Sequence, residues 1–162
     1  MTLLPPTVAE PSIESIGPLR LVGLCRRYAC QDSSGIFAQW GEFSRMGGSL
    51  PPPRDDNAYG ACRDPGPEEF DYLCAISVSD DPVPLTEPMQ SWQIPQAQYA
   101  LFRDRGHISG IKPLLSTIFQ TWLPQSDWQI APLPVIECYH EEFNPQTGEG
   151  GYEVWIPVRP RT

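Results

Sequence analysis

The sequence is poor in positive charge and in histidine. It has 11 Lys and Arg residues against 20 Asp and Glu residues, so its formal net charge is −9 at pH 7. Such a chain repels nucleic-acid phosphates and anionic lipid, and we expect neither as a partner. With only His107 and His140 present, a histidine metal site has few candidate groups. The glycine-rich stretches match no phosphate-binding fingerprint. We therefore expect no metal and no cofactor.

Disulfide and membrane signals are also missing. The five cysteines are odd in number and contain no Cys-x-x-Cys pair, which favours reduced, buried thiols. No run approaches the ~20 apolar residues that span a bilayer, and the first residues lack a basic stretch followed by an apolar one. These features predict a soluble, cytoplasmic protein.

Proline and glycine are abundant, with 20 and 13 residues, which excludes a long helical bundle or coiled coil. The prolines mark a rich segment over 1–18 and a connector around 82–88, and structured segments lie between such marks. Periodicity predicts helices over 36–43 and 109–122. It predicts strands over 19–29, 58–63, 70–79, 98–103, 134–140 and 152–158.

Both halves of the chain therefore have the order β-α-β-β. The stretch Ile36–Trp40 matches Ile118–Trp122 at three of five positions, each inside the helix of its half, which supports a duplication. We predict an α+β fold of two duplicated modules, 19–80 and 94–159, within one domain over 19–162. Each antiparallel sheet would carry its helix on one face and a ligand cleft on the other. Residues 1–18 would form an N-terminal arm.

Alternation along the last two strands assigns their faces. Tyr152 and Val154 would lie under the helices together with Ile136 and Cys138. The open face would then present Glu137, Tyr139 and Trp155. A carboxylate among aromatic rings can bind a flat organic cation. The alternative is that these residues are solvated or form ordinary cross-strand packing. His140-Glu141-Glu142 lacks a partner histidine and predicts no metal site.

Short motifs in a fixed order give the chain a family resemblance, which covers about residues 16–159. In the second half these are Ile94–Phe102, Gly106, Trp122–Ser126, Pro134–Tyr139 and Tyr152–Val158, and in the first half they are Trp40 with Phe43, Ala58–Gly60 and Phe70–Tyr72. In these motifs the chain resembles the GyrI-like small-molecule-binding family, which includes effector-binding domains of AraC-type and multidrug-responsive regulators.

The resemblance implies a duplicated fold with a cleft between its modules, in which a glutamate and aromatic walls bind lipophilic cations. Glu137 stands at that glutamate's position, and Tyr59 on the corresponding strand would be the equivalent residue of the first half. The expected ligand-binding residues are Glu137, Tyr139, Trp155, Tyr59, Trp40 and Trp92. The chain has no basic helical segment for reading DNA, so we expect a stand-alone form.

The leading hypothesis is a binding protein that senses or sequesters lipophilic cations. A hydrolase of strained electrophilic molecules is the first alternative, with Glu137 as general base and Tyr139 or Trp155 as positioning group. A gyrase-inhibiting protein is the second. We expect binding rather than catalysis, and a homodimer or a separate regulator protein stays open as a partner.

Overall fold

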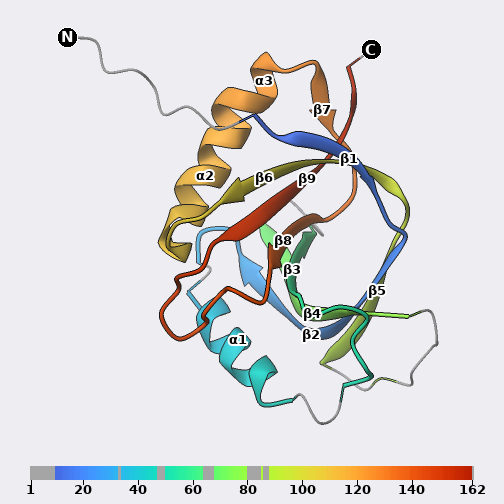
Figure 1. Ribbon diagram of the computed structural model, residues 1–162, viewed down its shortest axis with the longest axis vertical. Helices are drawn as coiled ribbons and strands as arrows, with labels where there is room; N and C mark the ends of the chain where they lie inside the picture. Colours follow the sequence, from blue (N-terminus) through green and yellow to red (C-terminus); the bar gives the residue numbers. More distant parts are fainter. Residues whose placement is uncertain are drawn as a thin grey trace.

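The computed structural model describes residues 10–32, 34–46, 50–63, 68–79, 85 and 88–161. Its core is an antiparallel sheet (Figure 1). The strands are β1 (Ser12–Ile16), β2 (Leu19–Ala29), β3 (Ala58–Arg63), β4 (Glu69–Val78), β5 (Met89–Ile94), β6 (Ala97–Asp104), β7 (Trp128–Ile130), β8 (Val135–Tyr139) and β9 (Tyr152–Pro160). One helix is α1 (Ile36–Ser44), and a second helical segment consists of η2 (Ile108–Gly110), α2 (Ile111–Thr117), η3 (Ile118–Trp122) and α3 (Leu123–Gln125).

The sheet shows the duplication directly. In the first half β2 pairs with β4 and β4 pairs with β3, and in the second half β6 pairs with β9 and β9 pairs with β8. The two halves meet where β3 pairs antiparallel with β8, with Gly60 opposite Glu137. The α+β fold of two β-α-β-β modules is therefore confirmed.

The sheet also closes on itself, because each module is preceded by a strand that pairs with the other module. β1 precedes β2 but pairs with β6, and β5 precedes β6 but pairs with β2. Only two residues separate β1 from β2, and only two separate β5 from β6. The β1–β2 run therefore pairs with the β5–β6 run in one register, from Ser12 opposite Leu101 to Leu24 opposite Met89. The result is a ring of strands, seen on the right of Figure 1.

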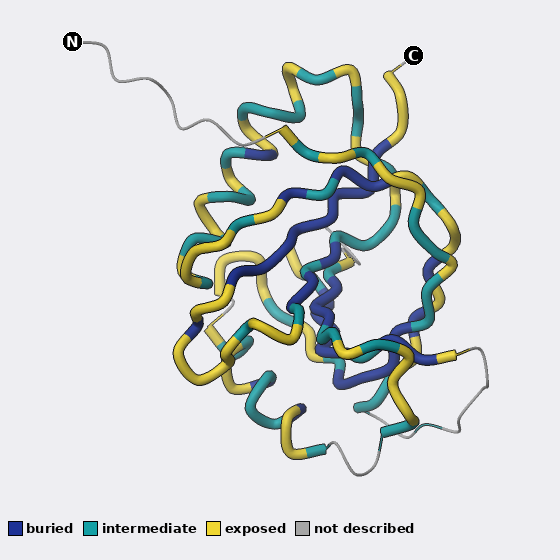
Figure 2. Tube along the Cα trace, viewed as in Figure 1, coloured by how far each residue is buried: buried dark blue, intermediate teal, exposed yellow. Residues whose placement is uncertain are grey.

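The ring has two differently packed sides. Its inside is filled by an apolar cluster to which β2, β3, β4, β5, β6, β8 and β9 all contribute, including Tyr59, Trp92, Tyr99 and Trp155. On the outside, Phe43 of α1 packs over Leu24 and Tyr72, and the second helical segment packs over Val154 and Ile156. The central strands are thus buried on both faces, as the dark tube in Figure 2 shows.

Several expectations differ from this structure. Ser12–Ile16, assigned to an N-terminal arm, is a strand of the sheet, while residues 1–9 of that arm lie outside the described residues. The sheet face away from the helices is turned inward and packed rather than left open.

Cys74 and Cys138 are buried free thiols, but Cys30 is exposed. None of the described helices is long and apolar enough to cross a membrane.

The face assignment of β8 was wrong. Ile136 and Cys138 lie inside the ring, where Ile136 pairs directly with Trp155 of β9. Tyr139 belongs instead to the cluster on the helix side. Glu137 alternates with Ile136 and Cys138 and therefore shares the side of Tyr139. Alternation misled because both faces of β8 are covered by protein, so neither set of side chains had to be the more polar.

Candidate functional site

Glu137 lies on the helix side of β8, at the junction of the two modules. Tyr72 of β4 and Tyr139 of β8 each donate a hydroxyl hydrogen bond of 2.7 Å to its Oε1. Trp40 of α1 donates its indole hydrogen to the Tyr72 hydroxyl at 3.0 Å. No described residue donates to Oε2. Glu137, Trp40, Tyr72, Tyr139 and the neighbouring Phe143 together form what we call the Glu137 site.

Aromatic rings surround this carboxylate. The Trp40 ring stands edge-on to that of Tyr139 at 5.6 Å, and Phe143 lies 4.7 Å from Tyr139 on the other side. Tyr72 and Tyr139 are buried, whereas Trp40 and Phe143 keep part of their surface exposed, as does Glu137 itself. The site therefore combines two buried hydroxyl donors with rings and a glutamate that are partly exposed.

Glycine at position 60 makes room for this arrangement. Gly60 of β3 faces Glu137 across the β3–β8 pair, and a Cβ there would lie 2.2 Å from the Tyr72 hydroxyl and 2.8 Å from Glu137 Oε1. Any larger side chain would occupy the space that the Tyr72–Glu137 hydrogen bond uses.

The electrostatics of Glu137 are unusual for a carboxylate. Burial raises its pKa above the ordinary value, and the hydrogen bonds from Tyr72 and Tyr139 offset part of that rise. No Lys, Arg or His among the described residues forms an ion pair with Glu137. Its ionised form consequently lacks a compensating positive charge within the described part of the chain.

Glu153 of β9 is the contrasting case. It is only 4% exposed, yet Arg103 and His140 reach its Oε2 at 2.6 and 2.7 Å, and Trp155 donates to its Oε1 at 2.9 Å. Burial alone would raise the pKa of Glu153, but the hydrogen bonds from Trp155, Arg103 and His140 outweigh it, and the pKa is lowered. Glu153 is therefore a charge-compensated structural carboxylate.

The predicted site residues separate into two groups. Glu137, Tyr139 and Trp40 come together. Tyr59, Trp92 and Trp155 lie instead inside the ring, where Tyr59 packs edge-on to Trp155 at 5.9 Å and Arg63 stacks 4.2 Å from the Trp92 ring. These three are packed inside the ring and do not contact Glu137 in the described structure.

Sequence reasoning missed Tyr72 and Phe143. Tyr72 lies in a motif of the family resemblance, but nothing local shows that its hydroxyl meets a carboxylate 65 positions away. Phe143 follows β8 in an irregular segment, where periodicity carries no signal.

Two hollows are present elsewhere on the described surface. One of about 800 Å³ lies beside β1, β6 and α2 and is lined by residues such as Ser12, Arg103 and Leu114. The other, of about 620 Å³, is lined by Asn57, Arg103, His140, Glu142 and Glu153. Glu137 lines neither of these two hollows.

Comparison with known proteins agrees with this architecture. A family model described as the GyrI-like small molecule binding domain matches residues 9–159. Among curated proteins, no match to the chain was found.

Solved structures also resemble the chain over nearly its whole length. A putative bacterial transcription regulation protein from Staphylococcus aureus MU50 gives a TM-score of 0.69 at 17% identity, covering 93% of this chain and 98% of that one. SAV2435 bound to tetraphenylphosphonium gives 0.71 at 16%, covering 93% and 94%. The EcmrR C-terminal domain gives 0.69 at 12%, covering 94% and 98%. At these identities the likeness shows the shared fold.

Proposed function

This protein belongs to the GyrI-like family of small-molecule-binding domains, and on that premise we propose that it binds lipophilic organic cations at the Glu137 site. Binding there would serve to sense or sequester such compounds. The observation that carries the proposal is the position of Glu137, a carboxylate held among four aromatic rings without a cationic partner among the described residues.

The charge balance supports a cationic ligand. A carboxylate that loses hydration needs a nearby positive charge or strong donors to stay ionised. Glu153 has Arg103 and His140 for this purpose, whereas Glu137 has only two tyrosine hydroxyls, both on Oε1. A cation that approaches Oε2 would supply the missing charge. A neutral ligand would not offset the free-energy cost of burying the ionised carboxylate.

The aromatic rings favour a ligand with an apolar body. Trp40 and Phe143 are partly exposed beside the carboxylate and can stack on flat or aryl substituents. Each close contact between a cation and an aromatic ring contributes about 0.5–2 kcal/mol. The net charge of −9 adds a long-range attraction for cations. SAV2435, which shares the fold, was solved bound to tetraphenylphosphonium, a ligand of this class.

Titration with tetraphenylphosphonium, followed by calorimetry, tests the proposal. We expect Glu137→Gln to weaken binding by about tenfold or more, which corresponds to ~1.4 kcal/mol. Glu141→Gln is the matched control, because Glu141 is an exposed glutamate close by in sequence, and its affinity should equal that of the wild type. Triphenylphosphine oxide, a neutral molecule with similar rings, should bind both proteins weakly and equally. Equal tetraphenylphosphonium affinity in the wild type and in Glu137→Gln would refute the role of Glu137.

A further inference from the structure

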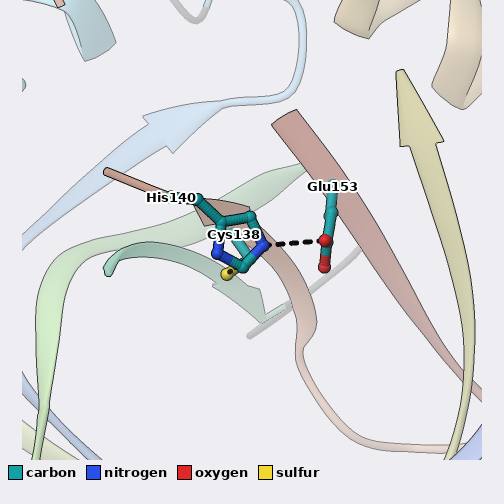
Figure 3. Close-up of side chains that lie close together, drawn as sticks. All are labelled: Cys138, His140 and Glu153. Atoms are coloured by element: carbon teal, nitrogen blue, oxygen red, sulfur yellow. Dashed lines mark hydrogen bonds and ion pairs between the residues drawn. The ribbon is translucent and has the colours of Figure 1, made fainter. Parts of the chain in front are cut away.

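A second cluster of ligating side chains lies on the other side of β8. The Sγ atom of Cys138, Nε2 of His140 and a carboxylate oxygen of Glu153 all lie within 4.8 Å of one another (Figure 3). Nε2 is 2.7 Å from Glu153 Oε2 and 3.9 Å from Cys138 Sγ. The three groups come from two neighbouring strands, β8 and β9, and the residue that follows β8.

The orientation of the His140 ring is set by Asn57. The Asn57 side-chain amide nitrogen lies 3.4 Å from the Tyr59 hydroxyl, and that hydroxyl donates to Asp55 Oδ2 at 2.8 Å. This places the Asn57 oxygen toward His140, where it lies 2.9 Å from Nδ1. An amide oxygen can only accept, so Nδ1 carries a hydrogen. The neutral ring then has its lone pair on Nε2.

That lone pair points at a carboxylate. Glu153 Oε2 also can only accept, so in the metal-free protein a proton on Nε2 fills the 2.7 Å contact. A metal ion that displaces this proton can bind the same two atoms. With the Cys138 sulfur beside the same nitrogen, the cluster combines the sulfur, imidazole and carboxylate donors that divalent zinc prefers.

We propose that Cys138, His140 and Glu153 form a Zn²⁺ site, separate from the Glu137 site. In a tetrahedral zinc centre the ligand atoms lie ~3.3–3.6 Å apart, so the sulfur and nitrogen need to approach slightly and the nitrogen and oxygen to separate by roughly half an ångström. Zinc replaces the proton on Nε2 and the proton on the Cys138 thiol, and both protons leave to solvent. Zinc keeps its charge throughout, and no bond other than these is made or broken.

Neighbouring residues complete the surroundings of the site. Asn57 remains on Nδ1 and fixes the imidazole tautomer, and Trp155 and Arg103 remain on the carboxylate as outer partners. Cys138 is fully buried, but the His140 side chain is 40% exposed and lines the hollow of about 620 Å³ together with Glu153. The ion can therefore enter from that hollow, and water or a small ligand would supply the fourth donor.

The two sites share a strand without sharing a face. Glu137 and Tyr139 lie on the helix side of β8, whereas Cys138 lies inside the ring. Zinc binding should consequently be unaffected by Glu137→Gln. This makes failure of the zinc site distinguishable from failure of the proposed cation binding.

Cobalt substitution of the full chain is the test, because Co²⁺ reports on its ligands. We expect one Co²⁺ per chain with a thiolate-to-cobalt charge-transfer absorption, displaced by Zn²⁺. Cys138→Ser should abolish the band, and His140→Gln should lower Zn²⁺ affinity at least tenfold in competition with a chromophoric chelator. Asn57→Ala should weaken binding about 10–100-fold, as loss of an outer partner does. Cys30→Ser and His107→Gln are the matched controls and should bind like the wild type, since both residues lie outside the cluster.

Near-ultraviolet circular dichroism verifies that each variant is folded. If Cys138→Ser does not fold, His140→Gln carries the test alone, because its ring is partly exposed. The proposal is overturned if Co²⁺ binds without a charge-transfer band. It is equally overturned if Zn²⁺ affinity and stoichiometry are the same in the wild type and in folded His140→Gln.

Discussion

Gly60 and Glu137 face each other across the pair of strands that joins the two modules, and the missing side chain of Gly60 is what lets Tyr72 reach the carboxylate. The candidate site thus lies at the junction between β3 and β8. β3 contributes an open space, β4 contributes a buried hydroxyl, and β8 contributes the acid. None of these strands could form the site alone.

Gly60→Ala should destabilise the protein and weaken cation binding together. The new Cβ would lie 2.2 Å from the Tyr72 hydroxyl, so Tyr72 has to move away from Glu137. Overpacking of this kind costs about 1–3 kcal/mol, which urea unfolding measures. Gly41→Ala in α1 is the control, because its Cβ would meet only an arginine side-chain atom at 3.9 Å. A fully stable Gly60→Ala variant with unchanged affinity would contradict this role of Gly60 at the β3–β8 junction.

Glu137→Gln should make the ligand-free protein more stable at neutral pH. The folded-state pKa of Glu137 is raised, chiefly by burial, so the fold favours the protonated acid. That stability is present below the ordinary glutamate pKa of about 4.3 and is lost as pH rises through the higher folded-state pKa. The neutral amide avoids the loss. The free energy of unfolding of the variant should exceed that of the wild type by on the order of 1 kcal/mol at pH 7, and the difference should shrink toward pH 4.

Glu153→Gln should show the opposite behaviour. The pKa of Glu153 is lowered because the hydrogen bonds from Trp155, Arg103 and His140 outweigh its burial. Its stabilising effect is therefore present above the ordinary glutamate pKa and is lost as pH falls through the lower folded-state pKa. At pH 7 the variant should lose about 1–3 kcal/mol of unfolding free energy, since hydrogen bonds to a charged group are replaced by weaker ones. Exposed Glu149→Gln provides a comparison that should show no such change.

Trp40→Phe should reduce both the affinity and the fluorescence response of cation binding. The substitution removes the indole hydrogen bond to Tyr72. It also replaces the indole that stands edge-on to Tyr139 with a smaller phenyl ring. We expect a loss of roughly three- to tenfold in affinity, in line with one weakened aromatic–cation contact. Trp128→Phe, in β7 and outside the Glu137 site, should keep both. A normal signal change in Trp40→Phe would show that another tryptophan reports binding.

The strands and the duplication could be predicted because their signals are local. Composition and the flanking turn residues defined 19–29 and 58–63 with the bounds that the structure shows. Prolines separated the elements, and the predicted helices 36–43 and 109–122 overlap α1, which ends at Ser44, and the second helical segment, which begins at Ile108 and ends at Gln125. The partners of those strands were not local. β1 was assigned to an arm and no strand was predicted over β5, because a strand that pairs with the opposite module has no nearby signature.

The sequence by itself determined the α+β class, the two modules and Glu137 with Tyr139 and Trp40 as candidate site residues. Only the tertiary structure decided which side of β8 faces the helices, and so separated Glu137 from Trp155 and brought Cys138 to His140 and Glu153. The physical reason is closure of the sheet. Alternation identifies a buried face only when the other face meets water, and in this ring both faces of the central strands are covered by protein.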